Sequence, residues 1–475
     1  MSKPDLLHQL QAYGEGGVYP FHMPGHKRNT ARLGNAIPYS MDITEIDGFD
    51  DLHAPDGILK DLNDRLCALY GAKHSFALVN GSTCGILAGI AAATQRGDKI
   101  LLARNCHKSV YNAVELLGLV PVYIAPPTDE TTGIAGSIAP ESVAEAIKQH
   151  NDIRLCVLTS PTYDGVISDI RTIAALLHAN DIPLLVDEAH GAHLVFTQNK
   201  ALSAVAAGAD IVIQSLHKTL PALTQTAAAH LCTDRIPPAA FQQKLSVFET
   251  SSPSYLLLSS IAECVRILEE KAETAFKTYE KELTDFSVKC KALTHLTVSC
   301  KGNDDLELHP VFFAFDGGKL PIVTANTNTD GVSLLQKLRA EYKIEGEMAA
   351  VSYALLMTSV CDTDEGFSRL FAALREIDRT LHPAAVPPQF ASVPLPPVVS
   401  PPCAAAKQTG VRVPLQNAVG KISLTTVWCY PPGVPLLVRG ERVTQEIADA
   451  LENAKAHGLK VIADSGEFPK ITVSD

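Results

Sequence analysis

The feature that most constrains the fold is a series of short apolar runs that alternate with helix-like segments. The runs occupy residues 75–79, 99–103, 121–124, 154–159, 183–187 and 211–214. This alternation predicts right-handed βαβ crossovers and an α/β domain with a mainly parallel sheet and helices on both faces. In open α/β sheets ligands lie beyond the carboxyl ends of the strands. We therefore look for catalytic groups directly after these runs.

A proline-rich stretch marks a boundary late in the chain. Eight prolines and no charged residue lie between His382 and Pro402, which predicts an extended linker. After about residue 259 the pattern changes to a charged helix near 263–281 and then to a mixed α+β stretch. The expected order is an N-terminal arm (1–30), a large domain (31–259), a small α+β domain (260–381), the linker (382–402) and a C-terminal domain (403–475).

Composition excludes several classes of protein. Forty Lys and Arg against 52 Asp and Glu give a net charge of −12, and no basic block interrupts it, which disfavours nucleic-acid binding. The eleven cysteines include no C-x-x-C pair, so we expect reduced thiols and not a disulfide framework. The N-terminus lacks an apolar signal core, and no apolar run is long enough to span a membrane. We expect a cytoplasmic protein.

The first run ends in Asn80-Gly81-Ser82-Thr83, which precedes an apolar helical segment. A glycine turn and two hydroxyls at a helix N-terminus offer donors to a phosphate group, assisted by the helix dipole. Taken alone, the same residues are more typical of an ordinary Ser/Thr N-cap. No Walker loop occurs in the chain, so this is not a P-loop.

The run at 183–187 ends in Asp187, followed by Glu188-Ala189-His190. A carboxylate at the end of a buried strand is unfavourable unless a cation or a protonated ring pairs with it. The Asp-Glu-Ala-His string resembles a helicase box, but the chain has no Walker lysine to accompany it. His190 and His193 have a spacing that zinc sites use, yet without cysteine partners they are more typical of hydrogen-bonded structural residues. We expect no metal.

The last run is followed by Ser215-Leu216-His217-Lys218. Burial and neighbouring cations lower the pKa of a lysine in such a place, which suits Schiff-base chemistry. The alternative is a lysine whose stem covers the strand end while its amine reaches water. The combination of a phosphate cradle, Asp187 and Lys218 at strand ends favours a pyridoxal phosphate site, with groups for the phosphate, the pyridine nitrogen and the aldehyde.

These segments resemble the bacterial Orn/Lys/Arg decarboxylases, specifically the short form without an N-terminal wing domain. That family has the type I fold of pyridoxal-phosphate-dependent transferases. The resemblance covers nearly the whole chain. Further matching segments are Phe21-His22-Met23-Pro24-Gly25-His26-Lys27-Arg28, Asp50-Asp51-Leu52-His53, Arg104-Asn105-Cys106-His107-Lys108-Ser109, Thr224-Gln225, Thr250-Ser251-Ser252-Pro253-Ser254-Tyr255 and Tyr430-Pro431-Pro432-Gly433.

The resemblance implies a role for each matched residue. Lys218 would hold the cofactor as a Schiff base, Asp187 would keep the pyridine nitrogen protonated, and His107 would stack on the ring. The phosphate ligands would be Ser82, Thr83, Ser215 and His217. Thr250 or Ser251 would reach the phosphate of a neighbouring subunit, so a homodimer or larger homo-oligomer with composite active sites is expected. His190 stands where larger relatives carry tryptophan, and its cofactor-binding role is left open.

The implied reaction is decarboxylation of a basic amino acid through an external aldimine and a quinonoid, with Lys218 or His217 returning a proton to Cα. Arginine and lysine are favoured over ornithine. Acidic side chains are the candidates for binding the substrate's distal cation, although a solvated loop would also explain the first five of them. They are Asp42, Glu45, Asp47, Asp50, Asp51 and Glu347.

Other functions share parts of this pattern. An aminotransferase or a lyase of the same fold would use the same cofactor frame, but few arginines in the small domain are available for an aminotransferase's substrate carboxylate. A non-catalytic pyridoxal phosphate or polyamine-binding protein would not need the complete set of Lys218, Asp187 and His107. A DEAH-type NTPase would need the Walker loop that the sequence lacks.

Overall fold

The computed structural model describes residues 5–16, 23–24, 27–28, 30–34, 36–298, 310–385, 389–430 and 433–474. The matched motif residues Phe21, His22, Gly25, His26, Pro431 and Pro432 lie outside the described residues. The chain divides into two compact units, each built from two chain segments. The first unit holds Met1–Ala93 and Pro183–Phe276, and the second holds Thr94–Ile182 and Lys277–Asp475.

The first unit contains four sheet strands and most of the strand ends at which we expected chemistry. The strands are β1 (His74–Leu78), β6 (Leu184–Asp187), β7 (Ile211–Ser215) and β8 (Ala227–Leu231), and they lie in the order β1-β8-β7-β6. β6 and β7 are parallel, whereas β8 is antiparallel to both of its neighbours. Its helices are α1 (Leu6–Glu15), α2 (Thr30–Leu33), α3 (Ile58–Tyr70), α4 (Gly81–Ala93), α8 (Ala204–Ala207), α9 (Leu216–Thr219) and α10 (Pro238–Phe248).

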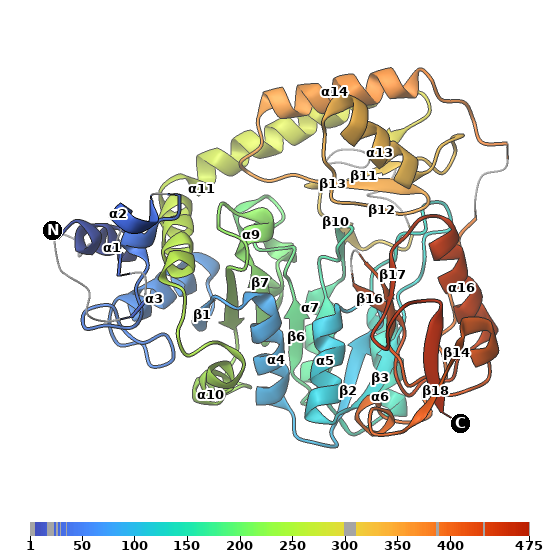
Figure 1. The fold of residues 1–475 in the computed structure, drawn as a ribbon, viewed down its shortest axis with the longest axis horizontal. Coiled ribbons are helices and arrows are strands. Elements are labelled where there is room, and N and C mark those ends of the chain that lie inside the picture. The colour runs from blue at the N-terminus through green and yellow to red at the C-terminus, as the bar shows by residue number, and fades with distance from the viewer. Residues whose placement is uncertain are drawn as a thin grey trace. The chain divides into compact units, whose positions relative to one another are not determined.

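Helix α4 lies close against the strands of this unit (Figure 1). A Cβ atom on Gly89 would lie 2.6 Å from Cδ1 of Leu185 in β6, so a larger residue at this position would force the Leu185 side chain to shift. The buried face of α4 includes Cys84, Ile86 and Ile90, which continue the apolar core of the strands. The close packing fixes the N-terminus of α4 relative to the end of β7.

The second unit begins with three parallel strands. They are β2 (Lys99–Ala103), β3 (Val120–Ile124) and β4 (Ile153–Thr159), in the order β4-β2-β3. The helices α5 (Lys108–Leu117), α6 (Pro140–Gln149) and α7 (Ile170–His178) alternate with them along the chain. The expectation of an α/β fold with a mostly parallel sheet is confirmed, and all six predicted runs are strands within one or two residues of the expected bounds.

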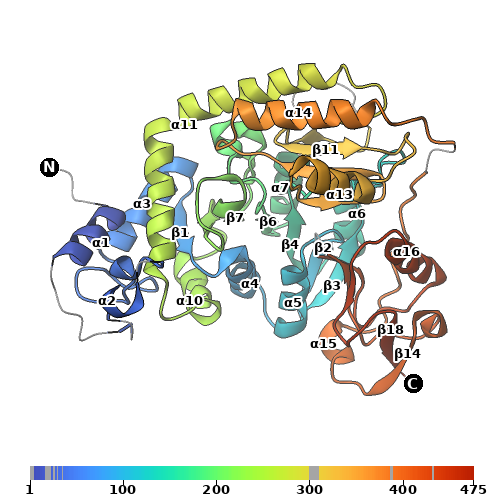
Figure 2. The ribbon, with the colours of Figure 1, turned by 45° about the horizontal axis from the view of Figure 1, so that its top comes forward.

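The small α+β part of the second unit follows the long helix α11 (Tyr255–Cys290), which begins in the first unit and exceeds the predicted 263–281 at both ends. Its four-stranded sheet has the order β12-β13-β11-β9. Figure 2 shows α13 and α14 beside β11. The elements are β9 (Thr297–Val298), β10 (Ala314–Phe315), β11 (Lys319–Val323), α13 (Gly331–Tyr342), β12 (Met348–Ala349), β13 (Tyr353–Met357) and α14 (Asp364–Asp378), and β10 pairs with β5 (Val166–Ile167).

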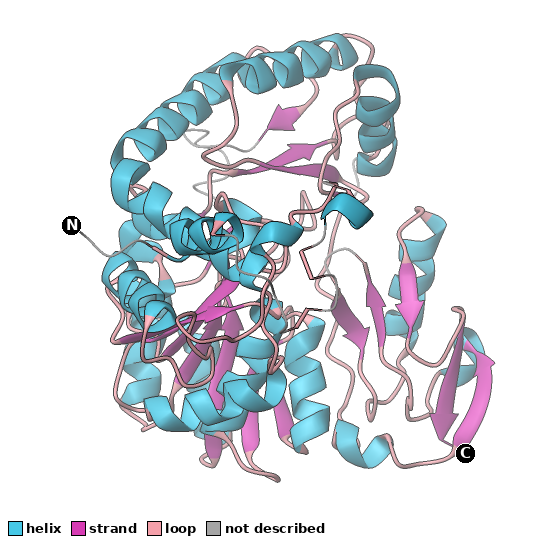
Figure 3. Ribbon diagram, turned by 60° about the vertical axis from the view of Figure 1, so that its left-hand side comes forward, coloured by secondary structure: helices cyan, strands magenta, loops and turns pink. Residues whose placement is uncertain are grey.

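The C-terminal residues have a hydrophobic core of their own, which includes Leu415, Val427, Leu437, Ile447 and Val473. Figure 3 shows the strands of this part near the C-terminus. Its elements are α15 (Pro402–Ala405), β14 (Gly410–Pro414), β15 (Val427–Cys429), β16 (Val434–Leu437), α16 (Gln445–Ala456), β17 (Val461–Ala463) and β18 (Lys470–Ser474). The separate core agrees with a distinct C-terminal folding element, while the residue boundaries of all the expected domains stay predictions.

Candidate active site

Lys218 lies in the single turn of α9, directly after the fully buried strand β7. Its Nζ atom is 3.0 Å from Nε2 of His190, a buried residue that follows β6. A hydrogen bond between an amine and an imidazole requires one of the two nitrogens to lack a proton. The structure therefore brings together the lysine expected to form a Schiff base and the histidine whose role the sequence left open.

Asp187 ends β6 and is 3% exposed. Burial raises the pKa of its carboxyl group, while the positive charge of Lys218 and a hydrogen bond from the Ala189 backbone N–H oppose that rise. The Ala189 nitrogen lies 3.1 Å from Oδ1 of Asp187. The carboxylate is thus held in a dry environment in which a cationic partner stabilises its charged form.

Two hydroxyls meet at the N-terminus of α4. Oγ of Ser82 lies 2.8 Å from Oγ of Ser215, which ends β7, and the neighbouring Thr83 is exposed. His217 donates a hydrogen bond from Nδ1 to the carbonyl of Thr226 at 2.9 Å. Burial and the charge of Lys218 lower the pKa of His217. The hydroxyl pair and the free N–H groups of the first helical turn form a suitable anion cradle.

The loop at 250–252 is exposed and is tied to the start of the cradle. The Thr250 backbone N–H donates to Oδ1 of Asn80 at 3.4 Å, and Nε2 of His53 donates to the Thr250 carbonyl at 2.9 Å. Ser251 is likewise exposed. The expected reach of Thr250 or Ser251 into a neighbouring subunit stays a prediction.

His107 belongs to the second unit, where it caps the N-terminus of α5. Its Nδ1 accepts a hydrogen bond from the Ser109 backbone N–H at 3.3 Å and lies 2.8 Å from Oγ of Ser109. Because Nδ1 is an acceptor, the proton of the neutral ring resides on Nε2. The expected stacking of His107 on the cofactor stays a prediction.

The acidic stretch contacts mainly backbone amides of its own region. Asp50 accepts hydrogen bonds from the backbone N–H groups of Asp51, Asp56, Gly57, Leu59 and Lys60, which hold the start of α3. Although burial alone would raise it, these donors hold the pKa of Asp50 below its ordinary value.

The other members of the stretch vary in exposure. Glu45 accepts from the Leu52 N–H at 3.2 Å, and burial raises the pKa of Glu45. Asp51 accepts from the His53 N–H at 2.7 Å, Asp47 is exposed and Asp42 is half-buried. For Asp50 and Asp51 the contacts favour a structural role, and a substrate role for the stretch stays a prediction.

Glu347 lies in the second unit, exposed, and accepts a hydrogen bond from the hydroxyl of Tyr163. Burial and the neighbouring carboxylate raise the pKa of Tyr163. Tyr163 follows β4, so this pair joins a strand end to the small α+β part. Sequence reasoning selected Glu347 but missed Tyr163, although Tyr163 lies four residues after a buried run, near the strand ends where we looked for chemistry.

Sequence reasoning also missed the role of Glu188. Its fully buried carboxylate accepts from the Ala204 N–H at 2.6 Å, from Nε2 of Gln214 at 2.6 Å and from Oγ of Ser203 at 3.1 Å. Burial raises the pKa of Glu188 to about 8. Gln214 in turn contacts Nε2 of His230 at 3.1 Å through its Oε1. The signal in the sequence was a second acid directly after Asp187, which continues a buried strand.

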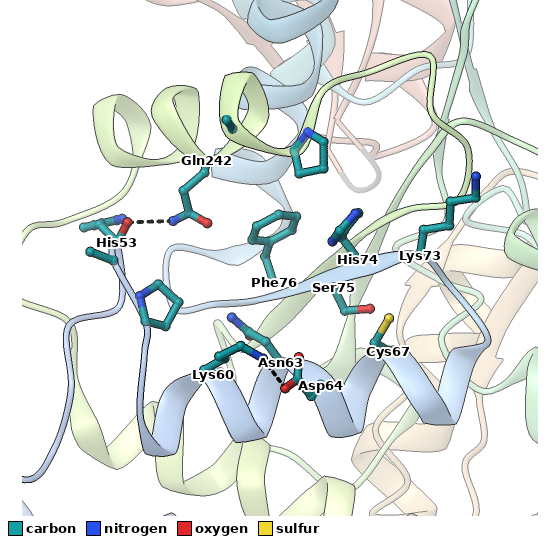
Figure 4. A pocket seen from close by; sticks show the side chains of 14 residues that line it. His53, Lys60, Asn63, Asp64, Cys67, Lys73, His74, Ser75, Phe76 and Gln242 are labelled. Atoms are coloured by element: carbon teal, nitrogen blue, oxygen red, sulfur yellow. Dashed lines mark hydrogen bonds and ion pairs between the residues drawn. The ribbon is translucent and has the colours of Figure 1, made fainter.

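A separate cavity of about 350 Å³ lies in the first unit between α3, β1 and α10. Figure 4 shows His53, Asn63, Phe76 and Gln242 among its side chains, with Gln242 donating to the His53 carbonyl at 3.2 Å. None of the residues expected to bind the cofactor is among the described residues that line it. We therefore do not assign the predicted chemistry to this cavity.

Within the described ranges, no group of three or more His, Cys, Asp and Glu side chains is arranged to hold a metal ion. Across the same part of the chain, none of the helices combines the length and apolar character that crossing a membrane requires.

The fold of the chain is shared with solved structures of known enzymes. Lysine decarboxylase LdcF from Francisella novicida superimposes with a TM-score of 0.84 at 20% identity, covering 99% of this chain and 81% of that one. At this identity the likeness shows the fold alone. The shared fold is the α/β fold described above.

Sequence comparison identifies the family. Residues 4–295 match the Orn/Lys/Arg decarboxylase major domain, and residues 391–459 match the C-terminal domain of the same family. Arginine decarboxylase from Bacillus subtilis is 34% identical over 90% of this chain and 88% of its own length. Arginine decarboxylase from Bacillus anthracis is 31% identical over 96% of this chain and 94% of its own length. The chain belongs to the Orn/Lys/Arg decarboxylase family, and as such it is an amino-acid decarboxylase acting on a basic amino acid.

Proposed function

We propose that the chain binds pyridoxal phosphate at the site formed by Lys218, His190 and Asp187. We further propose that it decarboxylates arginine in preference to lysine and ornithine. The observation that carries this proposal is the 3.0 Å contact between Lys218 and His190 beside the buried Asp187. A lysine, a histidine and a carboxylate from adjacent strand ends supply a nucleophile, a proton acceptor and a fixed negative charge at one place.

The residues present fit this cofactor. Asp187 offers a buried carboxylate whose negative charge a protonated pyridine nitrogen would neutralise. Such a partner would stabilise the charged form, which burial disfavours. Ser82 and Ser215 offer hydroxyls at the N-terminus of α4 for the phosphate, with Thr83 and His217 nearby along the chain. Lys218 would hold the aldehyde, and His107 is proposed to stack on the ring.

When bound, pyridoxal phosphate supplies an electron-accepting ring that stabilises the charge left at Cα as carbon dioxide departs. The chain's own residues bind, orient and move protons. The carboxylate of Asp187 would keep the pyridine nitrogen of the bound cofactor protonated, and Nε2 of His190 would exchange a proton with Nζ of Lys218 across their contact. Lys218 or His217 then donates a proton to Cα of the product, which directs the reaction to an amine.

The preference for arginine rests on the relatives. The two arginine decarboxylases from Bacillus match nearly their full length, whereas the lysine decarboxylase LdcF shares the fold at 20% identity. A guanidinium group pairs with a carboxylate through two parallel hydrogen bonds. Glu347, whose carboxylate already accepts from Tyr163, is the proposed partner for this group, with Asp42 and Asp47 as further candidates.

We also propose a homodimer in which Thr250 or Ser251 completes the phosphate site of the other subunit. Both residues are exposed on a loop that Asn80 and His53 hold in place. Light scattering at micromolar concentration tests the assembly, and mixing Lys218→Ala with Thr250→Ala subunits tests the composite site. A fully active monomer would contradict this part of the proposal.

The function is tested by measuring carbon dioxide release from arginine, lysine and ornithine in parallel, with the amine products identified. Arginine is expected to give the highest kcat/KM, and the purified protein is expected to show a visible Schiff-base absorbance. Release from none of the three would overturn the proposed function. A higher kcat/KM for lysine would overturn only the substrate preference.

A further inference from the structure

The connection between β2 and α5 carries His107, and the ring of His107 contacts α5. Ser109 contacts Nδ1 of the ring from within α5. The opposite edge of the ring, which bears Cδ2 and Nε2, faces a glycine of the C-terminal part, since a Cβ atom on Gly433 would lie 3.7 Å from both atoms. The ring is therefore bounded by α5 on one edge and by the C-terminal part on the other.

Gly433 also holds the backbone next to His107. Its carbonyl accepts a hydrogen bond from the Lys108 N–H at 3.2 Å, and its own N–H donates to the Cys429 carbonyl at 2.9 Å. The φ angle of Gly433 is +88°, in the left-handed region that favours glycine. Nζ of Lys108 lies 5.7 Å from the ring centre of Trp428 in β15. The segment between β15 and β16 thus contacts the two residues that begin α5.

Two ion pairs join the residues that follow β16 to the residue after β2 and to the last turn of α5. Arg104, at the end of β2, pairs with Glu441 through Nη1–Oε1 at 2.6 Å and Nη2–Oε2 at 3.0 Å, and both side chains are buried. Arg104 also donates to the Leu436 carbonyl at 3.0 Å. Arg439 pairs with Glu115, in the last turn of α5, at 2.8 Å. A buried bidentate pair resists displacement because separating it leaves two uncompensated charges.

We infer that the C-terminal domain is a positioning element for His107 and that Gly433 is the residue through which it acts. This inference rests on the proposed function, in which His107 stacks on the cofactor ring. The Arg104–Glu441 and Arg439–Glu115 pairs hold the residues that follow β16 in place. Gly433 fixes the Lys108 amide and lies against the Nε2 edge of the ring. His107 is the residue that touches the cofactor, and Gly433 acts through it.

The matched test compares two glycine-to-alanine changes in the C-terminal domain. Gly433→Ala imposes backbone strain beside His107. Gly420→Ala imposes the same kind of strain, because Gly420 has a φ angle of +85°, but a Cβ there meets nothing within 4 Å. Ser109→Ala serves as the reference for a ring loosened from the α5 side. Gly433→Asn replaces the alanine variant if that variant does not fold, since asparagine tolerates positive φ.

The readouts are the visible circular dichroism of bound pyridoxal phosphate, its release rate and the split between kcat and KM. We expect Gly433→Ala to change the dichroism in the same direction as Ser109→Ala, to speed cofactor release about 10-fold and to lower kcat by about 10-fold or more. Gly420→Ala is expected to match the wild type in all three while losing similar thermal stability.

The outcomes separate the two proposals. If the wild-type protein neither binds pyridoxal phosphate nor releases carbon dioxide from a basic amino acid, the proposed function fails. If the wild type is active and Gly433→Ala behaves like Gly420→Ala in dichroism and release rate, the function stands and the positioning role of the C-terminal domain is wrong.

Discussion

The acidic stretch at 42–51 and the strand end at 187–190 both carry carboxylates in the first unit, yet the groups that stabilise these carboxylates differ. Asp50 accepts hydrogen bonds from five backbone N–H groups, which keep the pKa of Asp50 low without any cation. Asp187 is buried and is stabilised by the charge of Lys218 and one backbone N–H from Ala189. We infer that the partner that stabilises each carboxylate separates Asp50, with its structural contacts, from Asp187, which is proposed to be functional.

The largest expected effect comes from removing the cation of the functional region. Lys218→Ala should lower carbon dioxide release by at least about 10³-fold, because the nucleophile and a proton donor are lost together. Borohydride reduction followed by mass spectrometry should then find no pyridoxyl adduct on the protein. Lys244→Ala, in α10, is the control that keeps both the adduct and the activity. A stoichiometric adduct in the Lys218 variant would refute the assignment.

Asp187→Asn tests whether the negative charge of Asp187 is needed for the reaction. Thermal unfolding of the same variant tests whether that charge is needed for folding. Asp187→Asn should lower kcat by about 10²-fold, since a neutral amide does not keep a ring nitrogen protonated. Its melting temperature should stay level or rise, because the change removes a buried charge. Steady-state kinetics and thermal unfolding on one preparation check both halves. A strong loss of stability with unchanged kcat would give Asp187 a structural role.

The converse is expected of Asp50. Asp50→Ala should lower the free energy of unfolding by about 2 kcal/mol, because it removes the acceptor that holds the N-terminus of α3. If the role of Asp50 is structural, the KM of this variant for arginine should stay within about twofold of the wild-type value when measured without denaturant. Glu273→Ala, an exposed acid on α11 with no proposed role, is the control. A tenfold rise in KM with intact stability would assign Asp50 to substrate binding.

Glu188 differs from both Asp50 and Asp187, because its buried carboxyl group is surrounded by three neutral donors. We expect it to have a smaller effect, on the pH dependence of stability. Its pKa is raised to about 8 in the folded protein from an ordinary value of 4.5. Between these values the folded chain holds a proton that the unfolded chain has released, so stability is greatest at low pH and falls as pH rises toward 8. We expect a loss of about 1 kcal/mol between pH 6 and pH 7, measured by urea unfolding. The slope should flatten in Glu188→Gln, and an identical slope in both proteins would show that Glu188 does not titrate.

Much of the fold was predictable because its signal is local. The strand at 99–103 has the same bounds in the sequence analysis and in the structure, since an apolar run bounded by polar residues carries enough information to define it. The charged helix was predicted too short, because α11 begins with the largely apolar residues 255–262 and continues through the mixed residues 282–290, which the charge pattern did not mark as helical.

The contacts of the site were only partly predictable. Ser82 and Ser215 were both selected, but the 2.8 Å approach of their hydroxyls depends on how α4 packs, which no spacing encodes. For His190 the sequence offered a position without a role, and its contact with Lys218 became visible only in three dimensions. The acidic stretch was chosen by charge, and charge alone does not reveal that the backbone donors nearest to Asp50 already occupy its carboxylate.

The division of the first unit into two chain segments has a consequence for how the protein is made. β1 pairs with β8, residue for residue from His74 and Leu231 to Leu78 and Ala227. During synthesis β1 and the N-terminus of α4 emerge from the ribosome long before β7 and β8. Until those strands follow, the edge of β1 is unpaired and Ser82 lacks its contact with Ser215. The hydroxyl of Ser82 meets Ser215 only after that delay. The proposed cradle therefore assembles only after β7 has been made, and the edge of β1 stays unpaired until β8 follows.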